Sequence, residues 1–462
     1  MNTIQKYRSL GTTFYWLSIL LLLLIFHTNH PIIDSDEGVT LNGAWNLWNN
    51  KALYIDFFEF VPPGSLYLIF LIWKIFNSAT YLLANLFAIL CIFLSTVGIF
   101  KISALLHKTN YNYFSPFIFG LSSLYWPIIN HNIFSLVPTI WATYYLAKGL
   151  KNNKLKYFAA SGLLTGASML ILQQKGIALF IVVLSTLVFL YFKEKQNHWA
   201  KATSVYVAAS LIPVILLFFK WSPILLYNNL IVFPLLNYRE TNKLPLTLLL
   251  FFVIIAIFAF YILRKRNNRL SYTLFAIQFG LLATTLARPG HLHISLAIFP
   301  LYVLAPSIIK EINSFRSRIK KTAYGVAIVI IFIITFPALQ SLQFNPPFSS
   351  ANTDTLDFIK ENCLSQYDLY VGPFLPGYYF ETSKLNVTPF SFIITNMHTE
   401  KDFELASVLI KQKEPKCAVL NYAMVNKFKY NQDNPIDNYI FSNYDEVKRF
   451  NDTIMFIRNE KN

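Results

Sequence analysis

Residues 30–64 read HPIIDSDEGVTLNGAWNLWNNKALYIDFFEFVPPG. This stretch follows an apolar run at about residues 12–26 that has no small-residue cleavage site, so we interpret that run as a retained first membrane span. Five of the 23 acidic residues of the chain lie between Asp34 and Glu59. Carboxylates at a membrane edge are costly and are typical of functional sites. The stretch therefore predicts a membrane protein whose first loop carries its chemistry.

The composition also favours a membrane protein. The chain of 462 residues is 55% hydrophobic and only 13% charged, whereas soluble domains carry about 25% charged residues. The net charge of +16 is spread over short basic clusters between apolar runs, which is the pattern of cytoplasmic loops. We therefore expect no nucleic-acid partner.

Ten further apolar runs follow the first loop. They lie at about residues 80–100, 112–129, 133–147, 157–172, 176–192, 202–220, 244–263, 270–287, 292–309 and 322–341. The run at 62–76 begins with two prolines and carries Lys74, so we interpret it as an interfacial or re-entrant helix. With that run not crossing, every basic cluster falls on the inner side, and the positive-inside rule predicts about eleven spans. The fold class expected is an α-helical polytopic membrane protein.

The end of the chain has a different composition. Residues 342–462 hold fifteen of the acidic residues, and short apolar strands alternate there with polar helices. The strands are expected at 369–371 and 418–420, and the helices at 353–362 and 400–412. We predict a membrane domain at 1–341, with a first outer loop at 30–79, and a small extracytoplasmic α/β domain at 342–462. Cys363 and Cys417 lie in the latter, and the sequence leaves open whether they pair.

Asp36 and Glu37 are the first candidates for chemistry. Ser35 or Asp36 is suited to cap a helix that begins near Glu37, and the spacing of its apolar residues predicts a helix along the membrane surface. A carboxylate held at a positive helix end beside a dry cavity suits a general base for an acceptor hydroxyl. The alternative is an ordinary capping box on a surface helix.

The order of motifs after the first span resembles that of the C-type glycosyltransferase (GT-C) superfamily. The resemblance is to bacterial relatives of protein O-mannosyltransferases and of lipid A aminoarabinose transferases. The motifs are, in order, Asp36-Glu37-Gly38, Ala44, Leu47, Tyr54-Ile55-Asp56 and Pro62-Pro63-Gly64. The resemblance extends along most of the chain and includes the outer C-terminal domain.

This resemblance implies transfer of a sugar from a polyprenyl-phosphate donor at the outer face of a membrane. It assigns the role of base to Asp36 and a positioning role to the adjacent Glu37. The donor lipid and other membrane lipid are the expected partners, and the acceptor is a glycan, a lipid or a protein. We expect a multi-pass protein of a bacterial inner membrane. Neither the sugar, the lipid carrier nor the acceptor is named by the sequence.

A leaving phosphate needs cationic stabilisation. Few cations are expected on the outer side, and relatives carry similar basic positions where this chain has them. We therefore name Lys175, Arg288, His291 and His293 as contacts of the donor phosphate, and we add Asp56 to the substrate-binding candidates. The structural alternatives are a lysine that extends to the membrane interface, an arginine that only marks a loop, and histidines in a polar loop.

The chain departs from the family pattern in two places. Val61 stands where many relatives have a lysine before the paired prolines, so one phosphate contact is missing. The short loop at 127–133 contains Asn130, His131 and Asn132 but no carboxylate. We therefore predict catalysis without a metal or another cofactor.

Two other functions remain open at this point. A lipid or polysaccharide transporter is also multi-spanning, but we find no internal repeat of the kind typical of transporters. A glycan ligase or polymerase is expected to concentrate its site in a large central outer loop. The segment 221–245 is aromatic and polar, and we interpret it as either a surface connection or part of an acceptor site.

Overall fold

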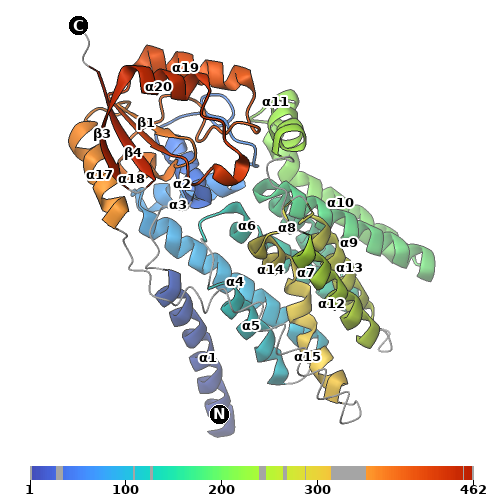
Figure 1. Ribbon diagram of the computed structural model, residues 1–462. Helices are drawn as coiled ribbons and strands as arrows, with labels where there is room; N and C mark the ends of the chain where they lie inside the picture. Colours follow the sequence, from blue (N-terminus) through green and yellow to red (C-terminus); the bar gives the residue numbers. More distant parts are fainter. Residues whose placement is uncertain are drawn as a thin grey trace. The chain divides into compact units, whose positions relative to one another are not determined.

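The structure is a computed structural model, and the chain forms two compact units assembled from separate segments (Figure 1). Unit 1 comprises Met1–Asn29, Asn85–Lys220 and Leu244–Gln343, and unit 2 comprises His30–Ala84, Trp221–Lys243 and Phe344–Asn462. The structure describes residues 3–27, 35–107, 110–124, 128–238, 246–263, 268–286, 288–313, 350–450 and 452–459. This division differs from the expected one at residue 341, because two earlier segments pack with the C-terminal segment.

Unit 1 is helical. Its elements are α1 (Thr3–His27), α4 (Tyr81–Leu106), η1 (Asn110–Tyr113), α5 (Phe114–Ser122), α6 (His131–Phe134), α7 (Leu136–Asn152), α8 (Leu155–Ile171), α9 (Gln173–Glu194), α10 (Asn197–Phe218), α12 (Thr247–Leu263), α13 (Arg269–Ala283), α14 (His291–Ala297) and α15 (Phe299–Asn313). Each expected apolar run up to residue 309 forms helix over much of its length, and the run at 322–341 lies outside the described residues.

Fewer helices are long and apolar enough to span a membrane than the sequence predicts. Among the described residues, α4, α9 and α10 are long and apolar enough to cross a membrane, and α14 with α15 makes a fourth candidate that is bent by 57°. Other apolar helices, such as α8 and α12, have 17 residues, which is short of the roughly 20 that a perpendicular span needs. Among the described residues, helix length and composition therefore support fewer spans than the expected eleven or so.

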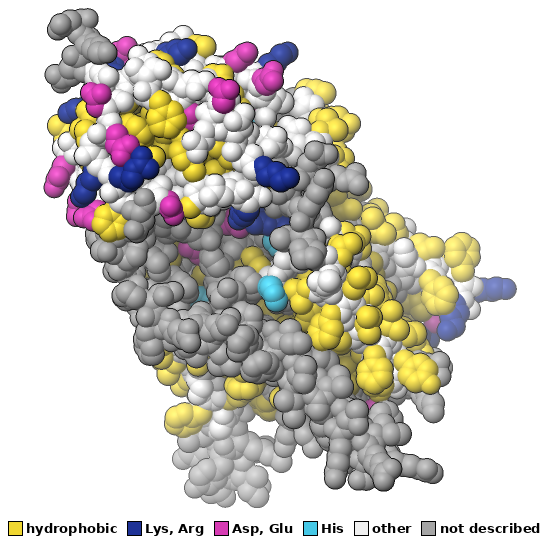
Figure 2. Space-filling view, viewed as in Figure 1, with side chains coloured by type: hydrophobic (Ala, Val, Ile, Leu, Met, Phe, Trp, Pro, Cys, Tyr) yellow, Lys and Arg dark blue, Asp and Glu magenta, His cyan; other side chains and the backbone are white. Residues whose placement is uncertain are grey.

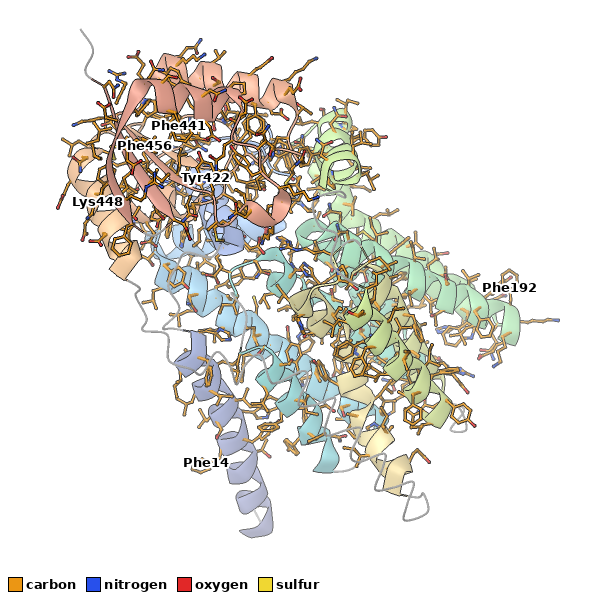
Figure 3. The ribbon with its side chains drawn as sticks, in the orientation of Figure 1. Phe14, Phe192, Tyr422, Phe441, Lys448 and Phe456 are labelled. Carbon is orange, nitrogen blue, oxygen red and sulfur yellow. A yellow bond between two sulfur atoms is a disulfide. The ribbon has the colours of Figure 1, made fainter. Side chains whose placement is uncertain are left out.

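Unit 1 combines close helix packing with an apolar surface. A Cβ atom on Gly166 of α8 would overlap the carbonyl oxygen of Ser210 on α10, so the small residue allows the two backbones to approach, as is common in membranes. Large apolar side chains are exposed on the outside, including Phe14 on α1 and Phe192 on α9 (Figure 3). In Figure 2 hydrophobic side chains dominate the described surface of these helices. Such a surface fits contact with lipid.

Unit 2 contains a four-stranded sheet. Its elements are α2 (Ser35–Trp48), α3 (Gly64–Phe76), α11 (Pro223–Tyr227), η2 (Asn228–Val232), η3 (Pro234–Tyr238), α17 (Ser350–Asn362), β1 (Leu369–Gly372), α18 (Gly377–Glu381), α19 (Glu400–Lys413), β2 (Cys417–Asn421), η5 (Asn426–Phe428), α20 (Pro435–Asn443), β3 (Tyr444–Phe450) and β4 (Thr453–Arg458). The strand order is β1-β2-β4-β3, with β1 parallel to β2 and the other pairs antiparallel. The two expected strands and two expected helices are present, whereas β3 and β4 were not predicted.

Helices cover both faces of this sheet. Successive side chains of a strand point to opposite faces, so Ala418 and Leu420 join the core with α19 and α20, while Cys417 and Val419 join the core with α17 and α18. Phe441 of α20 packs edge-on against Phe456 of β4 at 5.8 Å (Figure 3).

The two cysteines of unit 2 form a disulfide. The bond joins Cys363, just after α17, to Cys417 at the start of β2, and the two Cα atoms are 5.9 Å apart. The pairing that the sequence left open is thus made, and it ties α17 to the sheet.

The segment at 221–238 is helical and is part of unit 2. Its Trp221 donates a hydrogen bond from Nε1 to the carbonyl oxygen of Leu53 at 3.0 Å. Its Phe233 packs against Phe58 of the first loop at 4.7 Å and against His398 at 5.4 Å between ring centres. The segment is therefore helical and packs within unit 2 through these two aromatic side chains.

Candidate functional site

Asp36 and Glu37 lie in the first turn of α2. A helix N-terminus carries a partial positive charge, which favours carboxylates there. The two acids differ in exposure, because Glu37 is 2% exposed whereas Asp36 is only partly buried. Of the two, Asp36 is therefore the more exposed carboxylate.

The helix that carries these acids is held from several sides within unit 2. Asn42 donates from Nδ2 to the hydroxyl of Ser391 at 3.3 Å, and Trp45 donates from Nε1 to the carbonyl oxygen of Lys384 at 2.8 Å. Its other neighbour is α3, whose Leu66 lies against Gly43. We expected a helix along a surface with one apolar face, but nearly all of α2 is buried. The helix is a core element of unit 2, and this fixes the backbone beneath Asp36.

Asp56 closes a turn in the first loop. Its Oδ2 accepts a hydrogen bond from the backbone N–H of Ala52 at 2.7 Å. In the same motif Tyr54 has a positive φ of 66°, and its hydroxyl donates to the carbonyl oxygen of Val61 at 2.6 Å. The Tyr-x-Asp motif therefore shapes the loop before the paired prolines. A carboxylate also repels a phosphate, so this geometry favours a structural role for Asp56.

Glu59 is a buried acid to which sequence reasoning assigned no role. It is 1% exposed, and both carboxyl oxygens lack a hydrogen-bond partner of normal geometry, although Ser391 and the backbone of Phe60 lie near them. Burial raises the pKa of Glu59 to about 8 because desolvation outweighs these two neighbours. The only signal in the sequence was its place in the acid-rich first loop.

Lys175 lies in the first turn of α9 in unit 1 and is buried, with 4% of its surface exposed. Its ammonium group donates to the carbonyl oxygen of Asn132 in α6 at 3.4 Å. The start of α6 is fixed by Asn130, whose side chain accepts from the N–H of Ile133. The lysine is thus directed into the unit and does not extend away from it.

Three more basic side chains surround this lysine. The charges of Arg288, Lys175 and His131 all act on His293, so these four groups lie close together. His291, two residues before His293, is exposed and is not among the groups that act on His293. The structure therefore brings together three of the predicted contacts and adds His131, which the sequence placed only in a short loop.

This basic cluster has no acid from its own unit beside it. The sequence of unit 1 contains two acidic residues, Glu194 and Glu311. Glu194 lies at the opposite end of α9, about 28 Å from Lys175 at the rise of an α-helix, and it pairs with Arg269 at 2.7 Å. Glu311 lies near the end of α15. A concentration of positive charge of this kind attracts an anion.

No metal-ligand arrangement is found in the described ranges: no group of three or more His, Cys, Asp or Glu side chains there is placed to hold an ion. The absence of a metal stays a prediction of the sequence.

Comparison with known proteins gives a consistent picture. Residues 61–227 match the family model described as dolichyl-phosphate-mannose-protein mannosyltransferase. That range contains Lys175 and His131 but neither Asp36 nor Arg288. A search of the curated proteins found no match.

Solved structures resemble the whole chain. ArnT from Cupriavidus metallidurans bound to undecaprenyl phosphate is 10% identical, with a TM-score of 0.65 and coverage of 97% of this chain and 98% of ArnT. The oligosaccharyltransferase AglB from Archaeoglobus fulgidus, in complex with an inhibitory peptide and a dolichol-phosphate, is 11% identical, with a TM-score of 0.60 and coverage of 99% and 75%. The arabinofuranosyltransferase AftD from Mycobacteria is 13% identical, with a TM-score of 0.56 and coverage of 97% and 40%. At these identities the likeness is one of fold.

Proposed function

We propose that the chain is a membrane glycosyltransferase of the C-type (GT-C) superfamily and that it transfers a sugar from a polyprenyl-phosphate donor to an acceptor hydroxyl. The family model that matches residues 61–227 and the likeness of fold to solved glycosyltransferases support this proposal. The observation that carries this proposal is the clustering of four basic side chains, Lys175, Arg288, His293 and His131. The printed ligands of two structural neighbours, undecaprenyl phosphate and dolichol-phosphate, are lipid phosphates that such a cluster suits. A lipid transporter or a glycan polymerase receives no comparable support.

The reaction needs a base and a phosphate site. In the proposed mechanism, Asp36 accepts the proton of the acceptor hydroxyl as its oxygen forms a bond to the anomeric carbon. The bond between that carbon and the phosphate oxygen breaks, and the lipid phosphate leaves with the electron pair. Cationic groups stabilise the charge that develops on the phosphate, and this is the role that we propose for the basic cluster. Glu37, buried one residue further along, positions the start of α2.

We also propose that unit 2 faces the extracytoplasmic side of a bacterial inner membrane. The disulfide between Cys363 and Cys417 supports this, because such bonds persist in oxidising compartments and are rare in the cytosol. The positive-inside rule supports the same orientation.

A transfer assay tests the proposed activity. Membrane vesicles containing the chain are incubated with a polyprenyl-phosphate sugar labelled in the sugar, and the appearance of label in a lipid, glycan or protein fraction is followed. We expect label to leave the donor at a rate that depends on the chain. The assay is repeated with a panel of hexose and pentose donors and with all three acceptor classes. The proposal would be contradicted if every donor stayed intact.

A further inference from the structure

A cavity of about 230 Å³ lies in unit 2 near the C-terminal end of α2. Drug-sized ligands occupy roughly 300–1,000 Å³, so this cavity suits a single small ring or charged group. Polar side chains make up much of its wall, among them Asn46, Lys51, Asp56, Asn386, Thr388 and Lys413. The mechanism above gives this cavity no role.

Two lysines meet at one aromatic ring in this cavity. The ammonium groups of Lys51 and Lys413 lie 5.6 and 5.5 Å from the ring centre of Tyr367, which also lines the cavity. Neither lysine is among the ion pairs formed by the described residues. The one acid of the wall, Asp56, accepts a hydrogen bond from the N–H of Ala52 at 2.7 Å. Two lysines against one carboxylate leave the wall positively charged, which attracts an anion.

The neutral polar groups of the wall are not equally available. Asn386 is occupied in its own loop, where its Oδ1 accepts from the hydroxyl of Tyr379 at 3.1 Å and from the N–H of Thr388 at 3.0 Å. Asn46 is buried, with 6% exposure, and its side chain lines the cavity. Its amide can donate to and accept from a ligand hydroxyl there.

We propose that this cavity binds an acidic sugar, one that carries a carboxylate or a phosphate, as part of the acceptor. That this sugar belongs to an acceptor rests on the proposed function. Lys51 and Lys413 bind the anionic group, and Asn46 binds a ring hydroxyl. Asn46 lies ten residues along α2 from Asp36, which is about 15 Å at the rise of an α-helix. The cavity therefore takes a residue of the acceptor that is remote from the reacting hydroxyl.

Binding to the full-length protein in nanodiscs tests this proposal by ligand-observed NMR. The probes are glucuronic acid and glucose 6-phosphate, with glucose and inorganic phosphate for comparison. The test variant is Lys413→Ala. The matched control is Lys411→Ala, because Lys411 lies on the same helix over a different ring, that of Tyr439, at 5.4 Å and outside the cavity.

We expect the acidic sugars to bind at least about fivefold more tightly than glucose, the scale of one partly exposed ionic contact. Lys413→Ala is expected to remove that preference and Lys411→Ala to keep it. Equal binding of glucose and the acidic sugars, or equal effects of the two variants, would overturn the proposal. Inorganic phosphate that binds as tightly as glucose 6-phosphate would overturn the sugar part of it. Because binding needs no transfer, a failure here is distinct from a failure of the proposed activity.

Discussion

Gly38 of α2 rests directly on the backbone of Gly377, the first residue of α18. A Cβ atom on Gly38 would lie 2.7 Å from the nitrogen of Gly377 and 3.0 Å from its Cα. Because this contact lies two residues after Asp36, it sets the position of the proposed base within unit 2. Two backbones approach this closely only where a side chain is absent.

Replacing Gly38 with alanine is expected to push α2 away from α18. Overpacking of this kind typically costs about 1–3 kcal/mol, and it displaces Asp36. We expect a lower unfolding temperature, measured by intrinsic fluorescence in nanodiscs, and a transfer rate that falls by more than the loss of folded protein. Gly11→Ala is the control, because a Cβ atom there meets nothing within 4 Å. An unfolding temperature that changes equally in both variants would contradict the close contact.

Glu59 is expected to make stability depend on pH. Its pKa is raised from 4.5 to about 8 in the folded chain, so the unfolded chain releases this proton at a lower pH than the folded chain does. The free energy of unfolding is therefore highest below about pH 4.5. It falls as the pH rises towards 8, by roughly 4–5 kcal/mol at most. Glu59→Gln removes this contribution.

The measurement is the unfolding temperature between pH 5 and pH 8.5 for wild type and Glu59→Gln. We expect the wild type to lose more stability than the variant over this range. Glu361→Gln, an exposed acid on α17, is the control and should behave as wild type. Parallel pH profiles for wild type and Glu59→Gln would show that Glu59 is ionised at neutral pH.

The sequence predicted where the helices of unit 1 lie better than it predicted how many of them are long enough to span a membrane. Apolar runs are visible in one dimension, but helix ends depend on contacts such as that of α8 with α10. The strand β3 was missed because its side chains are exposed at most positions, YDEVKRF, and so lack an apolar pattern. This reason does not apply to β4, TIMFIR, which is mostly buried and was overlooked. β1 and β2 are almost fully buried and were recognised as apolar runs.

The sequence predicted some residues of the candidate site and missed others. Lys175, Arg288 and His293 come from distant positions, and likeness to a family named them before the structure brought them together. His131 had no such pattern, since a histidine in a short loop looks ordinary. The burial of α2 was not predicted, because its apolar residues alone suggest one buried face, while contacts from α3 and α18 bury the other sides.

Lys175 is expected to bind the donor phosphate. Lys175→Met keeps the length of the side chain and removes its charge, and a charged hydrogen bond contributes about 1.5–3 kcal/mol. We expect the apparent donor affinity to fall by about tenfold or more in a transfer assay at varied donor concentration. Lys193→Met is the matched control, because Lys193 lies at the other end of α9 and is exposed. Equal donor affinities of the two variants would exclude this role for Lys175.

The disulfide is expected to contribute to the stability of unit 2. Closing a loop between residues separated by 54 positions removes chain entropy worth about 4 kcal/mol. A reducing agent should therefore lower the unfolding temperature of the wild type. The variant with Cys363→Ser and Cys417→Ser should unfold at a lower temperature and should not respond to the reducing agent. A wild type that is equally stable with and without the reductant would contradict the bond.

The most direct measurement is single-turnover transfer by Asp36→Asn. This change removes the base and keeps the size and polarity of the side chain, and loss of a general base typically costs 10²–10⁴-fold in rate. We predict a rate at least about 100-fold below wild type, with the same unfolding temperature and donor affinity, while the exposed control Asp357→Asn keeps the wild-type rate. A wild-type rate for Asp36→Asn would contradict the assignment of Asp36 as the base.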